Sequence, residues 1–181
     1  YDIKEDQKII PVDLGFIVFN EKTYPNLINF FKELKVDYEK SNMSLAVSIK
    51  DSKLEYSGKN LDSLFCNKSN FLNLQFIKLI FDIIKFYKLA PNILTKKNEN
   101  LTLGNYLEKN QVSKDLINFH IIPMVAAIWS MPFIKAKDMP LDLFVNFFTN
   151  HGLFKLKNRP QWFTVTGRSR KYVSKVLPHI S

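Results

Sequence analysis

The chain has 181 residues, of which 46% are hydrophobic and 24% are charged. These fractions are those of ordinary globular proteins, and the length suffices for one domain or one and a half with a real hydrophobic core. Composition therefore favours a folded globular chain over an intrinsically disordered one. No apolar run reaches the roughly 18 residues that a membrane-spanning helix needs, and the N-terminus lacks the basic-then-apolar pattern of a signal peptide.

The formal net charge is +9, which raises the question of a nucleic-acid partner. The basic residues are almost all lysines, scattered among Asn, Ile and Phe, and we expect no nucleic-acid partner. Cys66 is the one cysteine, which excludes an intrachain disulfide and a cysteine-based zinc cluster and fits a cytoplasmic protein. The three histidines are too dispersed for a metal site, so no metal is expected.

The N-terminal part alternates between short strands and one helix. Residues 9–12 read as a strand, which residues 16–19 continue after a bend at Gly15. Pro25 favours the first turn of a helix that ends near Lys35, and Thr23 is the expected cap. Residues 44–50 and 53–57 are two short apolar runs around a turn, which predicts a β-hairpin.

Residues 72–89 form the longest predicted helix. Its polar residues recur at spacings of three and four and make one narrow stripe, namely Lys78, Asp82, Lys85 and Lys88. Most of the circumference is therefore apolar. The helix is either packed into a domain core, which we favour, or presents a face to lipid or to an apolar substrate.

The C-terminal part is mainly helical. After a polar connector at 91–100, helices are predicted at 102–109 with Thr102 as cap, at 113–120, at 123–130, and in "MPLDLFVNFFTNHG" before Gly152. The segment "RPQWFTVTG" predicts a strand, and "SRKYVSKVL" a last helix that ends before Pro178. Because strands and helices do not alternate as βαβ units, the predicted class is α+β, mainly helical with a small antiparallel sheet.

The motifs of standard catalysis are missing. The five glycines form neither a dinucleotide-binding loop nor a P-loop, so these residues cannot cradle a pyrophosphate in the usual way. His120 lies among apolar residues and is interpreted as a satisfied core histidine. His151 precedes Gly152 at a helix end, where it can line a pocket. No nucleophile triad and no paired carboxylates are recognisable, and the catalytic residues remain unassigned.

The stretch "NRPQWFTVTGRSRKYV" holds all three arginines together with Trp162 and Gly167. A glycine between strand and helix lets the backbone approach a planar ligand, and the start of the following helix favours an oxygen anion. The other interpretation is a plain strand–turn–helix with solvated arginines.

Four blocks in order, "PVDLGFIVFNEKTYPNLINFFKELKV", "LEYSG", "PMVAAIWSMP" and "FFTNHGLFKLKNRPQWFTVTGRSRKYV", carry a family resemblance. The chain resembles, over about residues 2–173, bacterial flavin-dependent amine-oxidoreductase-like proteins related to monoamine oxidases, protoporphyrinogen oxidases and phytoene desaturases. The resemblance implies part of a two-domain FAD/NAD(P)-binding amine oxidase fold that lacks the N-terminal glycine motif. It divides the chain into a linking strand and turn (1–22), a substrate domain (23–166) and a helix leading back to the FAD domain (167–181).

The resemblance also implies site residues and chemistry. FAD is the cofactor, and its binding residues correspond to Asp13, Gly15, Phe16 and Gly167. Aromatic-rich walls suit a small apolar or lipid-like substrate, which would transfer hydride to the flavin. The implied lining residues of the substrate pocket are Phe19, Trp129, His151 and Trp162, with Phe133 beside them.

One departure from the family pattern stands out, because Arg168 follows Gly167 where such proteins usually have a second glycine. An arginine there makes close flavin contact by that residue harder. A second hypothesis is a non-catalytic lipid- or membrane-surface-binding module, based on the apolar helix at 72–89 with its lysines. Peripheral membrane contact is compatible with both, and the sequence does not indicate an oligomeric state.

Overall fold

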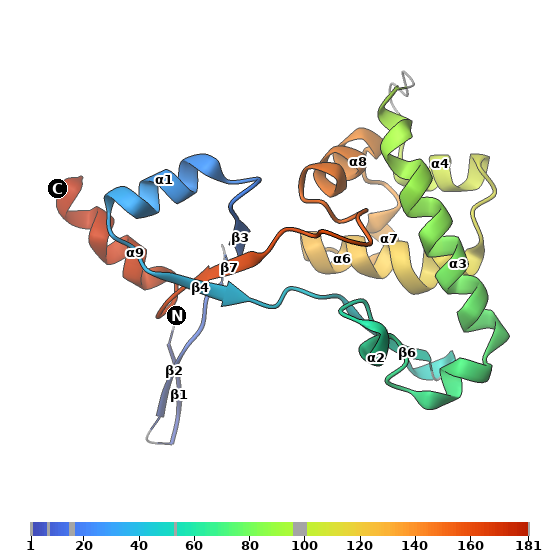
Figure 1. Cartoon of the computed structure of the whole chain (residues 1–181), viewed down its shortest axis with the longest axis horizontal. Coiled ribbons are helices and arrows are strands. Elements are labelled where there is room, and N and C mark those ends of the chain that lie inside the picture. The colour runs from blue at the N-terminus through green and yellow to red at the C-terminus, as the bar shows by residue number, and fades with distance from the viewer. Residues whose placement is uncertain (1, 7, 15–16, 53, 96–100, 181) are drawn as a thin grey trace. The chain divides into compact units, whose positions relative to one another are not determined.

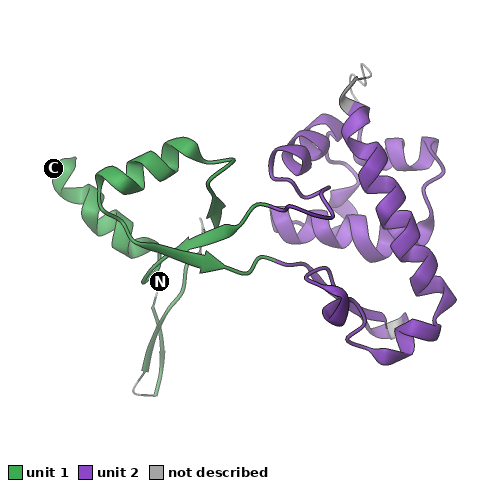
Figure 2. Cartoon of the chain, viewed as in Figure 1, with its two compact units in different colours: residues 1–43, 160–181 green, residues 44–159 purple. Residues whose placement is uncertain are grey.

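The computed structural model describes residues 2–6, 8–14, 17–52, 54–95 and 101–180. The chain divides into two compact units (Figure 2). Unit 1 combines both ends of the chain, Tyr1–Met43 and Pro160–Ser181, and unit 2 is the continuous stretch Ser44–Arg159. Of the described residues 53% are helical, and the sheets among them are small and antiparallel, which confirms the α+β class.

Unit 1 contains a hairpin, a three-stranded sheet and two helices (Figure 1). The sheet is antiparallel with order β3-β7-β4, so the strand from the C-terminal part lies between two strands from the N-terminal part. The elements are β1 (Asp2–Glu5), β2 (Lys8–Pro11), β3 (Phe19–Asn20), α1 (Pro25–Glu33), β4 (Tyr38–Ser41), β7 (Trp162–Val165), α9 (Ser169–Val176) and the 3₁₀ turn η5 (Leu177–His179).

The core of unit 1 is aromatic. Phe19 is fully buried, and its ring meets the rings of Phe31 and Tyr38 edge to face, with centroids 5.3 Å apart in both pairs. Helix α1 starts with Pro25 in its first turn, as predicted, but the expected cap at Thr23 is wrong. The Thr23 backbone N–H instead donates to Asn20 Oδ1 at 2.8 Å, because the asparagine side chain closes the turn before the helix.

Unit 2 is mainly helical and contains the larger core. Its elements are β5 (Ala46–Ile49), η1 (Lys50–Ser52), β6 (Leu54–Ser57), α2 (Leu61–Leu64), η2 (Lys68–Leu72), α3 (Leu74–Leu89), η3 (Ala90–Thr95), α4 (Leu103–Lys109), α5 (Lys114–Leu116), the π-helical turn η4 (Ile117–Ile121), α6 (Ile122–Trp129), α7 (Phe133–Ala136) and α8 (Leu141–Asn150). The predicted hairpin is confirmed as β5–β6, and the predicted caps are confirmed at Thr102 and, by its positive φ of 66°, at Gly152.

The helices predicted at 113–120 and 123–130 form one continuous helical stretch. Pro123 does not break it, because the turn before the proline widens to a π-helix in which the N–H of Ile122 bonds to the carbonyl of Ile117. Pro123 has no N–H to offer the carbonyl of Phe119 four residues earlier. The π turn therefore accommodates a proline inside a helix without a kink large enough to end it.

Helix α3 confirms the long helix predicted from residue 72, with its start at Leu74. Phe76, Leu79, Phe86 and Tyr87 are buried, whereas Phe81 is 67% exposed among the lysines of the polar stripe. Within the part of the chain that the structure describes, no helix has the length and apolar character needed to span a bilayer.

Candidate functional site

The first candidate site is a turn in unit 1 that brings together two segments far apart in the sequence. Asp13 Oδ1 accepts a hydrogen bond of 2.9 Å from the backbone N–H of Ser169, the first residue of α9. A hollow of ≈ 300 Å³ lies beside this contact; its lining is Pro11, Val12, Asp13, Leu14, Arg168, Ser169, Arg170 and Val173. Two predicted cofactor-binding segments, at Asp13 and after Gly167, therefore meet. Gly15 and Phe16 lie outside the described residues.

The backbone of this turn has torsions that favour glycine at two successive positions. Gly167 has φ +77°, and a Cβ placed on it would lie 3.0 Å from the Lys171 side chain. Arg168 has φ 75° and ψ 170°, a region that is almost restricted to glycine and costs a residue with a Cβ roughly 1–3 kcal/mol. The chain thus has glycine-type torsions at two successive positions, of which the second is arginine.

The other arginines of this stretch have protein partners. Arg170 forms an ion pair with Asp2 of β1, and Arg159 donates to the carbonyl oxygens of Lys155 and Gly58. Both arginines are exposed. Contacts within the protein therefore explain these two surface arginines, and no ligand is needed to explain them.

Phe19 and Trp162 lie on adjacent strands of unit 1 but on opposite faces of the sheet. Phe19 is directly opposite Phe163, and residues directly opposite share a face, so Trp162 next in the strand points the other way. Phe19 is fully buried in the core and Trp162 is 8% exposed. The two predicted pocket residues therefore do not line one common surface of this sheet.

Asn20 is a residue that the sequence prediction missed. It is fully buried and shares the sheet face of Trp162, its partner in the β3–β7 register. Its Oδ1 closes the turn to Thr23, but its Nδ2 has no hydrogen-bond partner among the described residues. A buried donor without a partner is costly and marks a position that merits attention. The asparagine at the end of an apolar run was the available signal.

In unit 2, Trp129 and His151 flank the same aromatic ring. Phe147 lies 4.6 Å from Trp129 and 3.9 Å from His151 between ring centroids, the latter pair stacked. His151 is buried and its Nδ1 donates to the Phe147 carbonyl at 2.8 Å. The structure therefore brings these two predicted pocket residues together through a third side chain.

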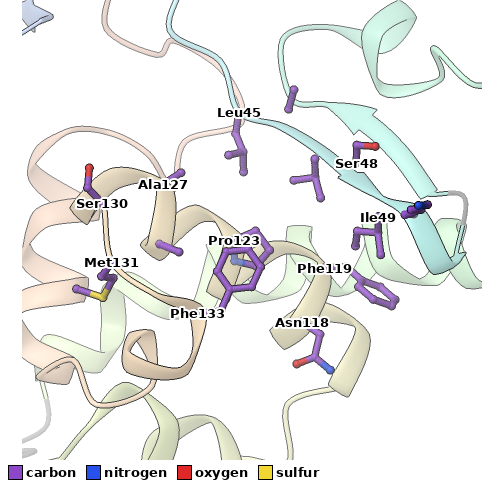
Figure 3. A pocket seen from close by; sticks show the side chains of 14 residues that line it. Leu45, Ser48, Ile49, Asn118, Phe119, Pro123, Ala127, Ser130, Met131 and Phe133 are labelled. Carbon is purple, nitrogen blue, oxygen red and sulfur yellow. The ribbon is translucent and has the colours of Figure 1, made fainter. Parts of the chain in front are cut away.

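An open apolar pocket of ≈ 690 Å³ lies in unit 2 (Figure 3). One wall is strand β5 with the residues next to it, and the other comes from η4, α6 and the segment that follows. The lining is Leu45, Ala46, Val47, Ser48, Ile49, Lys50, Asn118, Phe119, Pro123, Ala126, Ala127, Ser130, Met131 and Phe133. Phe133 is among the lining residues of this pocket, whereas Trp129 and His151 are not.

Behind this pocket, a directed chain of buried hydrogen bonds links three elements. Tyr56 of β6 donates to the Phe119 carbonyl at 2.8 Å, so its oxygen accepts from His120 Nδ1–H at 2.9 Å. His120 Nε2 then accepts from the hydroxyl of Tyr87 on α3 at 2.7 Å. The hydroxyl of Tyr56 thereby provides a hydrogen bond to the Phe119 carbonyl, to which Pro123, four residues later, offers no N–H. His120 is a buried and satisfied core histidine, as the sequence predicted.

Burial keeps this chain neutral around pH 7. It lowers the pKa of His120 to about 4, with a smaller effect of the Arg159 charge in the same direction. Burial also raises the pKa of Tyr87 to about 12, against the lowering effect of Arg159. Burial raises the pKa of Tyr56 as well, with the nearby Tyr87 adding to it. None of these groups exchanges a proton readily near neutrality, so the arrangement is suited to holding the pocket wall rather than to acid–base catalysis.

Over the ranges that the structure describes, no cluster of His, Cys, Asp and Glu could hold a metal ion. The described residues bring Asp13 together with the turn that follows Gly167. They also offer an apolar pocket in unit 2. No protein-family model matches the chain, and no curated protein sequence matches it significantly.

Proposed function

We propose that the chain forms the substrate-binding part of an FAD-dependent oxidoreductase of the amine oxidase and desaturase type, within a two-domain amine oxidase fold. The substrate would be a small apolar or lipid-like molecule oxidised at a C–N or C–C bond. The observation that carries the proposal is the hydrogen bond from Ser169 N–H to Asp13, because it joins the two segments that the resemblance assigns to the cofactor side.

The backbone at Arg168 supports the same proposal. Such proteins usually have two successive glycines here, and the chain retains glycine-type torsions at both positions although arginine fills the second. The pattern explains the glycine-type torsions of Arg168. Asp13 would hold this turn in place against the flavin, and Gly167 would let the backbone approach the ring.

A bound flavin would supply the hydride acceptor. The chain's own contribution is to bind and orient an apolar molecule and to exclude water from it. The pocket of unit 2 suits such a molecule because alkyl and aromatic side chains dominate its lining. Hydride transfer from a neutral amine leaves an iminium ion and requires no general base, which is compatible with a pocket whose one basic lining residue is Lys50. Oxidation of a C–C bond also releases a proton, which solvent at the open pocket would accept. The phosphates of FAD would be held by residues other than these, since the glycines form no phosphate-binding loop.

The proposal is tested on the natural polypeptide that contains these residues, with flavin bound and oxygen removed. Amines and unsaturated lipids are mixed with it in turn, and bleaching of the flavin absorbance reports reduction. We expect one of these classes to bleach the flavin. A polypeptide that retains flavin but is reduced by neither class would remove the proposed substrate type.

The pocket itself is tested by a matched pair of substitutions. Phe133→Asp places a charge on the pocket wall, and we expect the apparent KM for the apolar substrate to rise about tenfold or more. Ile134→Asp is the control, because Ile134 is 81% exposed and is not among the lining residues. Equal effects of the two substitutions would show that the substrate binds elsewhere.

A further inference from the structure

A cluster of exposed apolar side chains occurs in unit 2, around the start of α3. Leu61 is 74% exposed, Phe71 57%, Leu72 89% and Leu74 81%. We call these four residues the apolar ridge. Leu61 and Phe71 line one shallow hollow of ≈ 560 Å³, and Leu72 and Leu74 follow Phe71 directly in the sequence. Isolated exposed leucines are common, but a group of this kind marks an interaction site.

Local hydrogen bonds hold the ridge in this conformation. Asn60 and Ser63 form a reciprocal capping box on α2, with bonds of 2.8 and 3.0 Å. Asn67 Oδ1 accepts from the N–H of Ser69, and Asn73 Oδ1 accepts from the N–H of Phe76 at the start of α3. Each short turn is therefore closed by its own asparagine.

The segment is also anchored to the unit beneath it. Asn70 is 1% exposed and donates from Nδ2 to the carbonyl of Glu55 on β6 at 2.8 Å. Phe71 stacks on Phe65, with ring centroids 4.1 Å apart and planes within 10°. Because the backbone is fixed on its inner side, the leucines of the ridge cannot turn inward without breaking these contacts.

Along the segment that carries the ridge, lysines predominate, and Asp115 of α5 contacts Gln75 next to Leu74. Lys59, Lys68 and Lys78 are exposed, and none of them forms an ion pair within the described ranges. Asp62 is the one acidic residue between Lys59 and Lys78. Apolar side chains among unpaired lysines complement a surface that offers both hydrocarbon and negative charge.

We infer that the apolar ridge is a docking surface for the face of an anionic phospholipid membrane. The leucines and Phe71 would enter the headgroup and acyl boundary while the lysines contact lipid phosphates. The apolar contact is made by residues between Leu61 and Leu74, and α3 beyond Leu74 contributes Lys78. This inference does not depend on the flavin proposal, since it rests on exposure, local rigidity and charge alone.

The first test is co-sedimentation of the chain with vesicles of phosphatidylcholine, with and without phosphatidylglycerol. We expect binding to the anionic vesicles that weakens as salt is raised, and much weaker binding to the neutral ones. Absence of binding to anionic vesicles at low salt would overturn the inference.

Substitutions locate the contact. Leu72→Gln with Leu74→Gln should lower the partition constant about tenfold or more, because two nearly fully exposed leucines lose their transfer into the lipid. The control is Leu143→Gln with Leu156→Gln, at leucines that are 49% and 48% exposed elsewhere in unit 2. Thermal unfolding checks that both double variants fold. Equal losses in the two would overturn the inference.

The lysines are tested in the same way. Changing Lys59, Lys68 and Lys78 to glutamine should reduce binding to anionic vesicles and its salt dependence. The matched control, which removes the same charge elsewhere in unit 2, changes Lys109, Lys137 and Lys157, all exposed. If the control weakens binding equally, net charge and not this surface attracts the protein.

The single cysteine provides a direct probe. Cys66 is exposed and lines the hollow beside Leu61 and Phe71, so an environment-sensitive fluorophore on its thiol reports insertion. We expect a blue shift on adding anionic vesicles and none on raising the protein concentration alone. A shift that follows protein concentration in the absence of lipid would assign the ridge to a second copy of the chain and contradict the membrane proposal.

Discussion

At the scale of single residues, the local sequence creates backbone strain at one position and leaves a carbonyl without its α-helical donor at another. Arg168 takes backbone torsions that favour glycine, and the carbonyl of Phe119 loses its helical partner to Pro123. The torsions of Arg168 cost strain energy. The Phe119 carbonyl accepts a hydrogen bond from the hydroxyl of Tyr56 instead. Both lead to predictions about stability that need no ligand.

Arg168→Gly should stabilise the chain by about 1 kcal/mol, because the strain at φ 75° is relieved by more than the added chain entropy of glycine costs. Urea unfolding measures the change. Arg168→Ala is the control, since it removes the same charge but keeps the Cβ. Stabilisation by alanine as large as that by glycine would show that the charge, and not the backbone, was responsible.

Tyr56→Phe should destabilise the chain by roughly 1–3 kcal/mol, because it takes the hydroxyl away from the part-buried Phe119 carbonyl and from the buried His120 ring nitrogen. Urea unfolding again gives the free energy. The control is Tyr106→Phe, at a half-buried tyrosine whose hydroxyl makes no hydrogen bond within the described ranges. A loss no larger than that of the control would mean that the directed chain of hydrogen bonds contributes nothing to stability.

The chain should become less stable as pH falls from about 6.5 towards about 4 because of His120. Its pKa is lowered from 6.5 to about 4 in the folded state by burial, with a smaller contribution from Arg159, so the unfolded state binds the proton first. The contribution of the neutral His120 ring to the free energy of unfolding is complete above pH 6.5. It falls by on the order of 3 kcal/mol as the pH drops towards 4.

Unfolding free energies measured across this pH interval test the prediction, with His120→Gln as reference. The difference in slope between the two proteins isolates the histidine from the titrating carboxylates. Parallel curves would show that His120 binds protons equally in both states.

The core position of His120 was predictable from its apolar neighbours, but its partners were not. Tyr56 and Tyr87 lie 64 and 33 residues away from it in sequence, and no local pattern connects them. For Asp13 too, the family resemblance indicated the residue but not its partner. Its contact with Ser169 spans 156 residues and required the fold.

At the scale of elements, local signals predicted most helices and the β5–β6 hairpin. Thr102 caps the start of α4 with its side chain, and Gly152 follows the end of α8 with a positive φ. Both signals depend only on residues that are close in the sequence. The failures have non-local causes. Strand β4 was missed because Tyr38 and its neighbours pair with β7, around Val165, in the C-terminal part of the chain.

The packing of α4 gives a prediction at this scale. The N–H of Gly104 donates to the Lys137 carbonyl at 2.9 Å, and a Cβ on Gly104 would lie 3.1 Å from that oxygen and 3.0 Å from the Lys137 Cβ. Gly104→Ala should therefore destabilise the chain by about 1–3 kcal/mol in spite of the better helix propensity of alanine.

Thermal or urea unfolding measures that loss, and Gly58→Ala serves as control because nothing lies within 4 Å of the position that its added methyl group would take. A neutral or stabilising effect of Gly104→Ala would show that α4 can move away from the segment around Lys137 at little cost.

At the scale of the whole molecule, the division into units follows long-range pairing and not sequence order. The segment 1–22, α1 and β4 belong to one unit with residues 160–181, whereas the predicted segments ended at 22 and 166. Composition and periodicity carry no information about which distant strands pair, so this division could not be predicted from local patterns. The assignment of FAD-linked and substrate roles to these segments stays a prediction.

The most direct test of the central claim is the visible absorption spectrum of the natural polypeptide that contains this chain, purified without added cofactor. The proposal predicts the absorption bands of a bound flavin, and their loss or weakening when Asp13→Ala releases the turn at Ser169. A folded polypeptide that shows no flavin bands, and gains none when FAD is added, would contradict the account.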